Sequence, residues 1–177
     1  KYIRDIFAKR QQSASLKNFD IQREIDKNGT VDKVLAKDDV VLIQITKEPI
    51  STKGPRISTQ ISITGRFMIL IPFDHKVSIS KKIKSAEERD RLRTLIESIR
   101  PEGMGVIIRT VAEGKKVAEL HNDMNALIQK WETAFRNIQK QKIPSKILSE
   151  EDIASSILRD NFNQDFVSII CDDEKMV

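Results

Sequence analysis

Residues 105–110 read Gly-Val-Ile-Ile-Arg-Thr, and this short run carries the clearest structural information in the chain. Its three apolar, β-branched residues predict a buried strand that delivers Arg109 and Thr110 together at its end. A guanidinium group supplies two parallel charge-assisted donors, and a hydroxyl group adds a third. The run therefore favours a phosphate site, although an Arg-Thr pair at a strand end is also a common surface feature.

The pattern on both sides of this run predicts an α+β chain. Apolar runs and period-two alternation predict earlier strands at residues 41–46, 57–63, 67–71 and 77–80. A capping box, Ser85-Ala86-Glu87-Glu88, predicts a helix that ends at Pro101 and Gly103. An apolar stripe that includes Trp131 predicts a longer helix over residues 117–141.

A new unit is predicted after Pro144. Ser149 and Asp152 predict the start of a short helix through Leu158, and a strand is expected at residues 166–171. Cys171 ends that strand, so we expect it to be a small buried core residue.

Length and composition indicate one globular domain or two small ones. The chain has 177 residues, of which 39% are hydrophobic and 32% charged, and no apolar run is long enough to span a membrane. It shows no secretory signal peptide, and its single cysteine suits a reducing cytoplasm. With two histidines and one cysteine, no zinc site is predicted within it. Because it starts at Lys1 and stops soon after a strand-like run, we expect a fragment of a longer protein.

The net charge of +5 is unevenly distributed. From Ser149 onward there are eight acidic and two basic residues, a net of −6, so the first 148 residues carry +11. Three of the cations, Lys47, Lys53 and Arg56, lie in a loop rich in Gly and Pro between two predicted strands. This distribution favours a polyanionic partner, with nucleic acid first, and the loop is suited to its backbone. An ordinary solvated loop with charged side chains is the alternative.

Several motifs also occur in a fixed order along the chain. They are QITKEP at 44–49, TKGPR at 52–56, ISITGRF at 61–67, PEGMGVIIRT at 101–110, and a later helix with Trp131 and Glu132. Over roughly residues 38–177 the chain thereby resembles the bacterial ribonuclease E/G family.

The resemblance implies an α+β architecture in consecutive parts. Residues 1–37 would be an insertion or a partly disordered part of an OB-type module, and residues 38–63 would be the C-terminal strands of that partial β-barrel. Residues 64–148 would form a small α+β subdomain, the 5′-sensor, which recognises the monophosphate at the 5′ end of RNA. Residues 149–177 would begin an RNase H-like α/β element.

The resemblance also implies site residues. Arg109 and Thr110 match the pair that binds the 5′-phosphate, and Gly65 matches a position whose backbone N–H approaches the terminal nucleotide. Ile69 stands where an aliphatic residue packs nearby, and Lys53 matches a lysine of the RNA-binding loop. The physical chemistry agrees, because a terminal phosphomonoester carries nearly two charges where an internal diester carries one.

The longer parent would be a cytoplasmic, homo-oligomeric endoribonuclease that acts on single-stranded RNA in RNA processing and decay. By resemblance, its catalytic aspartates, its Mg²⁺ and the cysteines that bind its Zn²⁺ lie beyond Val177. The chain itself is therefore expected to bind RNA ends without a catalytic residue, a metal or another cofactor of its own.

Two other functions fit parts of the sequence. A general RNA-binding or ribosome-associated module without end specificity would explain the basic first 148 residues. A self-contained metal nuclease using Asp172 and Asp173 is disfavoured, because adjacent acids in one turn do not form a two-metal clamp.

Overall fold

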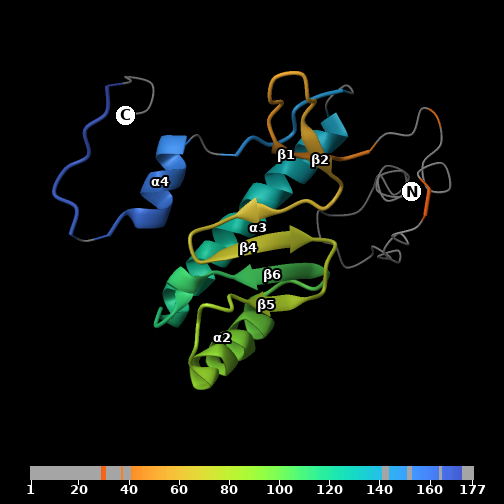
Figure 1. Ribbon diagram of the computed structural model, residues 1–177. Helices are drawn as coiled ribbons and strands as arrows, with labels where there is room; N and C mark the ends of the chain where they lie inside the picture. The colour runs from red at the N-terminus through yellow and green to blue at the C-terminus, as the bar shows by residue number, and fades with distance from the viewer. Residues whose placement is uncertain are drawn as a thin grey trace.

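The computed structural model describes residues 29–30, 37, 41–140, 144–150, 153–163 and 165–172. Nearly all of the segment 1–37 lies outside these described residues. The elements in chain order (Figure 1) are β1 (Gln44–Lys47), β2 (Arg56–Ser58), β3 (Ile63–Thr64), β4 (Met68–Pro72), β5 (Val77–Ile79), α2 (Ala86–Ile99), β6 (Met104–Ile108), the 3₁₀ turn η3 (Thr110–Ala112), α3 (Val117–Lys140) and α4 (Ile153–Asn161).

Four of the strands form one mixed sheet in the order β3-β4-β6-β5. β4 runs antiparallel to both β3 and β6, whereas β5 runs parallel to β6. The parallel pair is joined through α2, as expected because parallel strands need a long crossover. β1 and β2 pair separately in an antiparallel hairpin (Figure 1).

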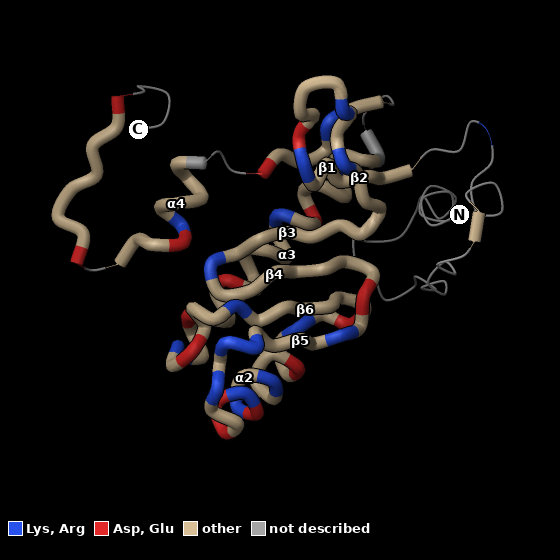
Figure 2. Tube along the Cα trace, in the orientation of Figure 1, with Lys and Arg blue, Asp and Glu red and all other residues tan. Residues whose placement is uncertain are grey.

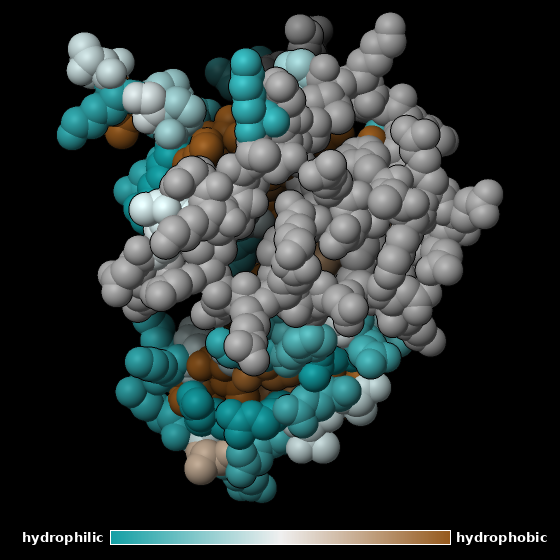
Figure 3. Space-filling model, turned by 90° about the vertical axis from the view of Figure 1, so that its right-hand side faces the viewer, coloured by the Kyte–Doolittle hydropathy of each residue, from teal (hydrophilic) through white to brown (hydrophobic). Residues whose placement is uncertain are grey.

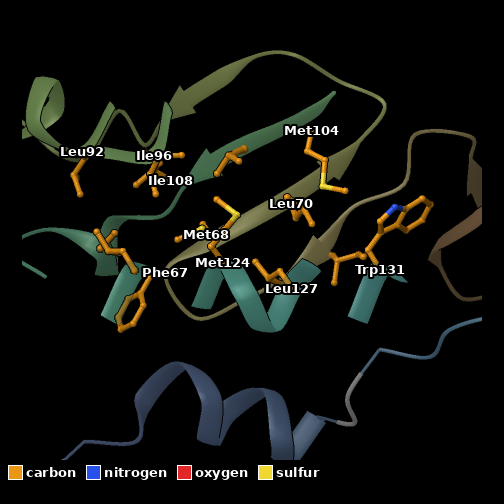
Figure 4. Close-up of a cluster of buried hydrophobic side chains, with 14 of the residues drawn as sticks. Phe67, Met68, Leu70, Leu92, Ile96, Met104, Ile108, Met124, Leu127 and Trp131 are labelled. Atoms are coloured by element: carbon orange, nitrogen blue, oxygen red, sulfur yellow. The ribbon is translucent and has the colours of Figure 1, made fainter. Parts of the chain in front are cut away.

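One face of the mixed sheet carries the hydrophobic core. Met68 and Leu70 of β4 and Val106 and Ile108 of β6 are fully buried there, because alternate strand residues point to the same face. Helices α3 and α2 supply the opposing side chains (Figure 4), which include Met124, Leu127, Trp131, Leu92 and Ile96. Complete burial of such a side chain contributes about 1.5–3 kcal/mol, so this core holds the β6 strand end in place.

The three predicted helices are confirmed within the described residues as α2, α3 and α4. Ser85 is the N-cap of α2, and its hydroxyl accepts a hydrogen bond from the Glu88 N–H at 3.2 Å. Helix α3 covers the predicted range as far as it is described. Trp131 is 1% exposed and meets Phe73 edge to face at 5.5 Å, so it is the packing anchor that the stripe predicted.

Two strand predictions need correction. The stretch 57–63 is divided into β2 and β3, because residues 59–62 bend between the hairpin and the mixed sheet. Residues 166–171 form no strand, and Cys171 is exposed rather than buried. The apolar run has the composition of a strand, but no strand in the described part of the chain lies alongside to satisfy its backbone.

The predicted α+β class is confirmed, because a mainly antiparallel sheet packs against helices. Asp152, the expected cap of the short helix, is outside the described residues, and α4 is described from Ile153 onward. Among the described residues, no helix combines the length and apolarity needed to cross a lipid bilayer. On the face drawn in Figure 3, hydrophilic side chains surround a smaller apolar area where the described residues form the surface.

Candidate functional site

Arg109 follows β6 directly and makes the densest set of polar contacts in the described part of the chain. Its Nη1 donates to the carbonyl oxygens of Gly65 and Arg66 at 2.8 and 3.0 Å. Nη1 and Nη2 also donate to the two carboxylate oxygens of Asp160 at 2.8 and 2.7 Å, a bidentate pair. The Arg109 side chain is 25% exposed, so this constellation lies at the surface end of the core.

The carbonyl groups that Arg109 contacts belong to the tight turn between β3 and β4, which Asp123 of α3 holds. The Asp123 carboxylate accepts hydrogen bonds from the N–H groups of Arg66, Phe67 and Met68 at 3.1, 2.9 and 3.2 Å. These contacts fix the turn against α3. As a result, the carbonyl oxygens of Gly65 and Arg66 lie beside the Arg109 guanidinium group.

Gly65 is required by this turn. A Cβ at that position would lie 2.8 Å from both Asp123 oxygens, a separation that real Cβ atoms essentially never show. The Gly65 N–H donates to the Met68 carbonyl oxygen at 2.8 Å, within the turn. The structure thus explains the glycine through close packing against Asp123, and its expected role beside an RNA end stays a prediction.

Helix α4 closes the other side of Arg109. Besides Asp160, it brings Arg159, whose Nε donates to the Asp160 carboxylate at 3.1 Å and whose Nη1 lies 3.5 Å from the Thr64 carbonyl oxygen. Arg66 reaches back and donates from Nη2 to the Phe162 carbonyl oxygen just after the helix. Three guanidinium groups, those of Arg66, Arg109 and Arg159, therefore lie near the carboxylates of Asp160 and Asp123, so the cluster carries a net charge of +3 − 2 = +1.

The Thr110 side chain points to different partners from those of Arg109. Its hydroxyl oxygen lies 2.8 Å from the Ser80 hydroxyl oxygen, and the Ser80 oxygen accepts from the Lys82 N–H at 3.3 Å. The two neighbouring residues thus leave the strand end together but are held by separate elements, Arg109 by the 65–66 turn and α4, and Thr110 by the end of β5.

The other predicted residues lie further out. Ile69 of β4 pairs with Ile107 in β6, on the sheet face opposite the core, where Ile107 is 37% exposed. Lys47, Lys53 and Arg56, named the hairpin cations below, are exposed on the β1–β2 hairpin (Figure 2), with Lys47 directly across from Arg56. They share no sheet with Arg109, so the structure groups Gly65 with Arg109 and leaves the hairpin cations as a separate surface.

The Arg109–Asp160 pair stays ionised at physiological pH. Hydrogen bonding to Asp160 raises the pKa of Arg109 above its usual value. The same bond from Arg109 lowers the pKa of Asp160 well below its usual range, with a further contribution from Arg159. Neither group titrates near pH 7, so the pair is a fixed electrostatic contact and no pH switch.

One edge of the Arg109 guanidinium group stays open. A guanidinium group can bind an anion through its end, Nη1 with Nη2, or through its side, Nε with Nη2. Asp160 and the two carbonyl groups occupy the end. Nε has no hydrogen-bond partner in the described part of the chain, and it is absent from the unpartnered buried atoms there, which are Arg100 Nε and Trp131 Nε1. Nε is therefore not fully buried, and we infer that the side edge is the one open to a ligand.

Four residues of this constellation escaped the sequence reasoning: Arg66, Asp123, Arg159 and Asp160. Asp123 stands beside the buried positions Leu120, Met124 and Leu127, and a carboxylate at the border of a core stripe is the one local signal that could have revealed it. No group of three potential metal ligands occurs among the described residues, and Asp173 lies outside them.

The sequence model of the Ribonuclease E/G family matches residues 62–177, about two thirds of the chain. Ribonuclease E of Nostoc sp. is 37% identical over 144 residues, 81% of this chain and 21% of that protein. Ribonuclease G of Haemophilus influenzae is 38% identical over 120 residues, 68% of this chain and 24% of that protein.

The chain thus spans about a fifth to a quarter of the length of these curated relatives. Among solved structures, a mutant Staphylococcus aureus RNase P protein described as defective in mRNA degradation overlaps 40% of this chain and 73% of that one. The TM-score is 0.33 and the identity 15%, a likeness that carries no argument about fold or function.

Proposed function

Since the chain belongs to the ribonuclease E/G family, we propose that it is the RNA-binding, regulatory part of an endoribonuclease. Its task is to recognise the 5′-monophosphate end of single-stranded RNA during RNA processing and decay. The longer protein hydrolyses the RNA backbone with groups outside the described residues, in the cytoplasm and as a homo-oligomer. Magnesium and zinc, which the family resemblance implies, would be bound by those other parts.

The observation that carries this proposal is the open side edge of Arg109. The edge presents two parallel N–H donors, Nε–H and Nη2–H, at a spacing that matches two oxygens of a phosphate. The guanidinium group is held on its other edge by three acceptor groups, so its orientation is set before RNA arrives. A fixed fork beside further guanidinium groups favours a terminal phosphate dianion over the single charge of an internal diester.

Thr110 supports the same function. Ser80 accepts a hydrogen bond from the Lys82 N–H and can donate its own proton to the Thr110 oxygen. The Thr110 proton then remains available for a phosphate oxygen, since one hydroxyl–hydroxyl hydrogen bond uses only one of the two protons. Thr110 would add a donor to the Arg109 fork, with Ile69 and the Gly65 turn beside the terminal nucleotide.

The hairpin cations would contact the RNA backbone away from its end. They form one exposed basic surface on the β1–β2 hairpin, and their contacts with phosphates carry no sequence information. In this proposal the hairpin is the C-terminal part of an OB-type module, residues 64–148 are the 5′-sensor, and α4 opens an RNase H-like element. The Gln44 side-chain amide bonds to the Ser62 backbone at 2.8 and 3.1 Å, which holds the hairpin to the segment just before β3.

The test is a titration of two short oligoribonucleotides of the same sequence, one with a 5′-monophosphate and one with a 5′-hydroxyl. A charged bidentate contact is worth about 1.5–3 kcal/mol, so the wild type should bind the phosphorylated RNA roughly ten- to hundredfold more tightly. Arg109→Lys keeps the charge and loses the fork, and it should remove most of this preference. Arg109→Ala should remove all of it.

Arg93→Ala is the matched control, because Arg93 is an exposed arginine whose contact is an ion pair with Asp90 at 3.7 Å. It should leave the preference unchanged. Equal binding of both RNAs by the wild type would contradict end recognition and support a general RNA-binding module, the second candidate that the exposed hairpin cations favour. In that case circular RNA should bind as tightly as linear RNA.

A further inference from the structure

We propose that Asp160 is a positioning residue of the phosphate site, which holds the end of the Arg109 guanidinium group so that its side edge faces the RNA. Helix α4 thereby completes the site from a segment that follows the predicted sensor. This inference rests on the proposed function, because it assigns the orientation of the same arginine.

The first argument is geometric. An arginine side chain that extends from a strand end can rotate about several bonds, and each rotation redirects its donors. Here the two carboxylate oxygens of Asp160 fix the plane of the Arg109 guanidinium group through bonds of 2.8 and 2.7 Å. The turn carbonyl groups of Gly65 and Arg66 bind only Nη1, so Asp160 is the acceptor that also holds Nη2 and fixes the end of the group at both nitrogens.

The second argument concerns the position of α4. Among the side chains of α4 that the structure describes, residues 154–161, none belongs to the buried core, and Ile157 is 56% exposed. Its contacts with the β3–β4 turn are polar ones, made by Asp160, by Arg159 and through the Phe162 carbonyl oxygen. The helix adds little apolar packing, but its Asp160 carboxylate binds Arg109 in a bidentate pair. We therefore infer that the role of α4 here is to orient the Arg109 guanidinium group.

The charge of Asp160 opposes phosphate binding, so the balance of charges matters. Arg159 and Arg109 both donate to the Asp160 carboxylate. This carboxylate binds the end of the Arg109 guanidinium group, so it does not occupy the side edge proposed for the phosphate. With Arg66 and Asp123 included, three positive charges face two negative charges, a net of +1. A phosphate at the side edge therefore still meets a net positive cluster.

The opposite arrangement is that Asp160 imitates a phosphate and competes with RNA for Arg109. The two arrangements predict changes of opposite sign for Asp160→Asn. As a positioning residue, Asp160 should be needed for end recognition, so the variant should bind 5′-monophosphorylated RNA about tenfold more weakly, with little change for 5′-hydroxyl RNA. Tighter binding of the phosphorylated RNA would overturn the proposal and identify Asp160 as a competitor.

A double-mutant cycle separates positioning from a general structural role. If Asp160 acts through Arg109, Asp160→Asn should weaken the end preference in the wild type and have no further effect in the Arg109→Lys background. Additive losses would overturn the proposal. Asp160→Glu should recover part of the preference, and the exposed control Asp165→Asn should leave it at the wild-type value.

Two outcomes distinguish this inference from the proposed function. If the wild type prefers the phosphorylated RNA and Asp160→Asn keeps the full preference, the positioning role is wrong while end recognition stands. If the wild type shows no preference, the proposed function and this inference both fail. Emission from Trp131, the single tryptophan, verifies that each variant is folded.

Discussion

Removal of the Asp123 carboxylate should be the most costly change at the candidate site. The carboxylate accepts three backbone hydrogen bonds at 2.9–3.2 Å from the β3–β4 turn. A hydrogen bond to a charged group contributes about 1.5–3 kcal/mol, but these three share one half-buried carboxylate, and water can replace part of them. We therefore expect Asp123→Ala to lower the free energy of unfolding by about 3 kcal/mol, a large part of the usual 5–15 kcal/mol.

The assay is urea unfolding followed by the emission of Trp131, which lies on the same helix and is 1% exposed. In Asp123→Asn, the amide oxygen can replace the carboxylate oxygen that binds Phe67 and Met68, and only the bond to Arg66 is lost. That variant should lose about 1 kcal/mol. The control is Asp90→Ala, since the Asp90 side chain is 77% exposed and should contribute less than about 0.5 kcal/mol. Equal stability of Asp123→Ala and Asp90→Ala would refute the role assigned to Asp123.

Three further changes test neighbouring features. Gly65→Ala should destabilise the fold by about 1–3 kcal/mol because its Cβ meets the Asp123 carboxylate, and urea unfolding should show a smaller cost when Asp123 is already alanine. Hydrogen bonding from Arg91 lowers the pKa of Glu88 from 4.5 to about 2, so the stabilisation present above pH 4.5 is lost as pH falls through about 2. Glu88→Gln should remove that part of the pH dependence, measured as the urea midpoint between pH 5 and 2. Replacing all three hairpin cations with alanine should weaken both RNAs equally and reduce the slope of log affinity against log salt by about 2, measured by titration at several salt concentrations.

The sequence predicts those parts of the fold whose signals are local. The cap at Ser85 is set by residues within one turn, and the burial of Trp131 follows from its place on an apolar stripe. The apolar run before Arg109 is strand β6 for the same reason. In each case, the residues that decide the structure lie next to one another along the chain.

The candidate site could be predicted only in part, because its contacts join distant segments. Asp123 is 57 residues from Arg66, and Asp160 is 51 residues from Arg109, so no periodicity indicates either contact. The failure at residues 166–171 has a related cause. Composition predicts that a segment favours extended structure, but a strand also needs a neighbour with free backbone groups. That neighbour is a property of the whole fold.

Because α4 is attached at the periphery, the described part of the chain should contain one region of high local stability and one of low local stability. Strand β6 and helix α3 are tied into the core and should exchange their amide hydrogens only in rare global opening. The described side chains of helix α4 add nothing to the buried core, so we expect it to detach in local opening that leaves the sheet intact. A conformational change that displaces the segment after Pro144 would then break the contact between Asp160 and Arg109 at small energetic cost. A conformational change in another part of the protein would in this way alter recognition of the RNA 5′ end.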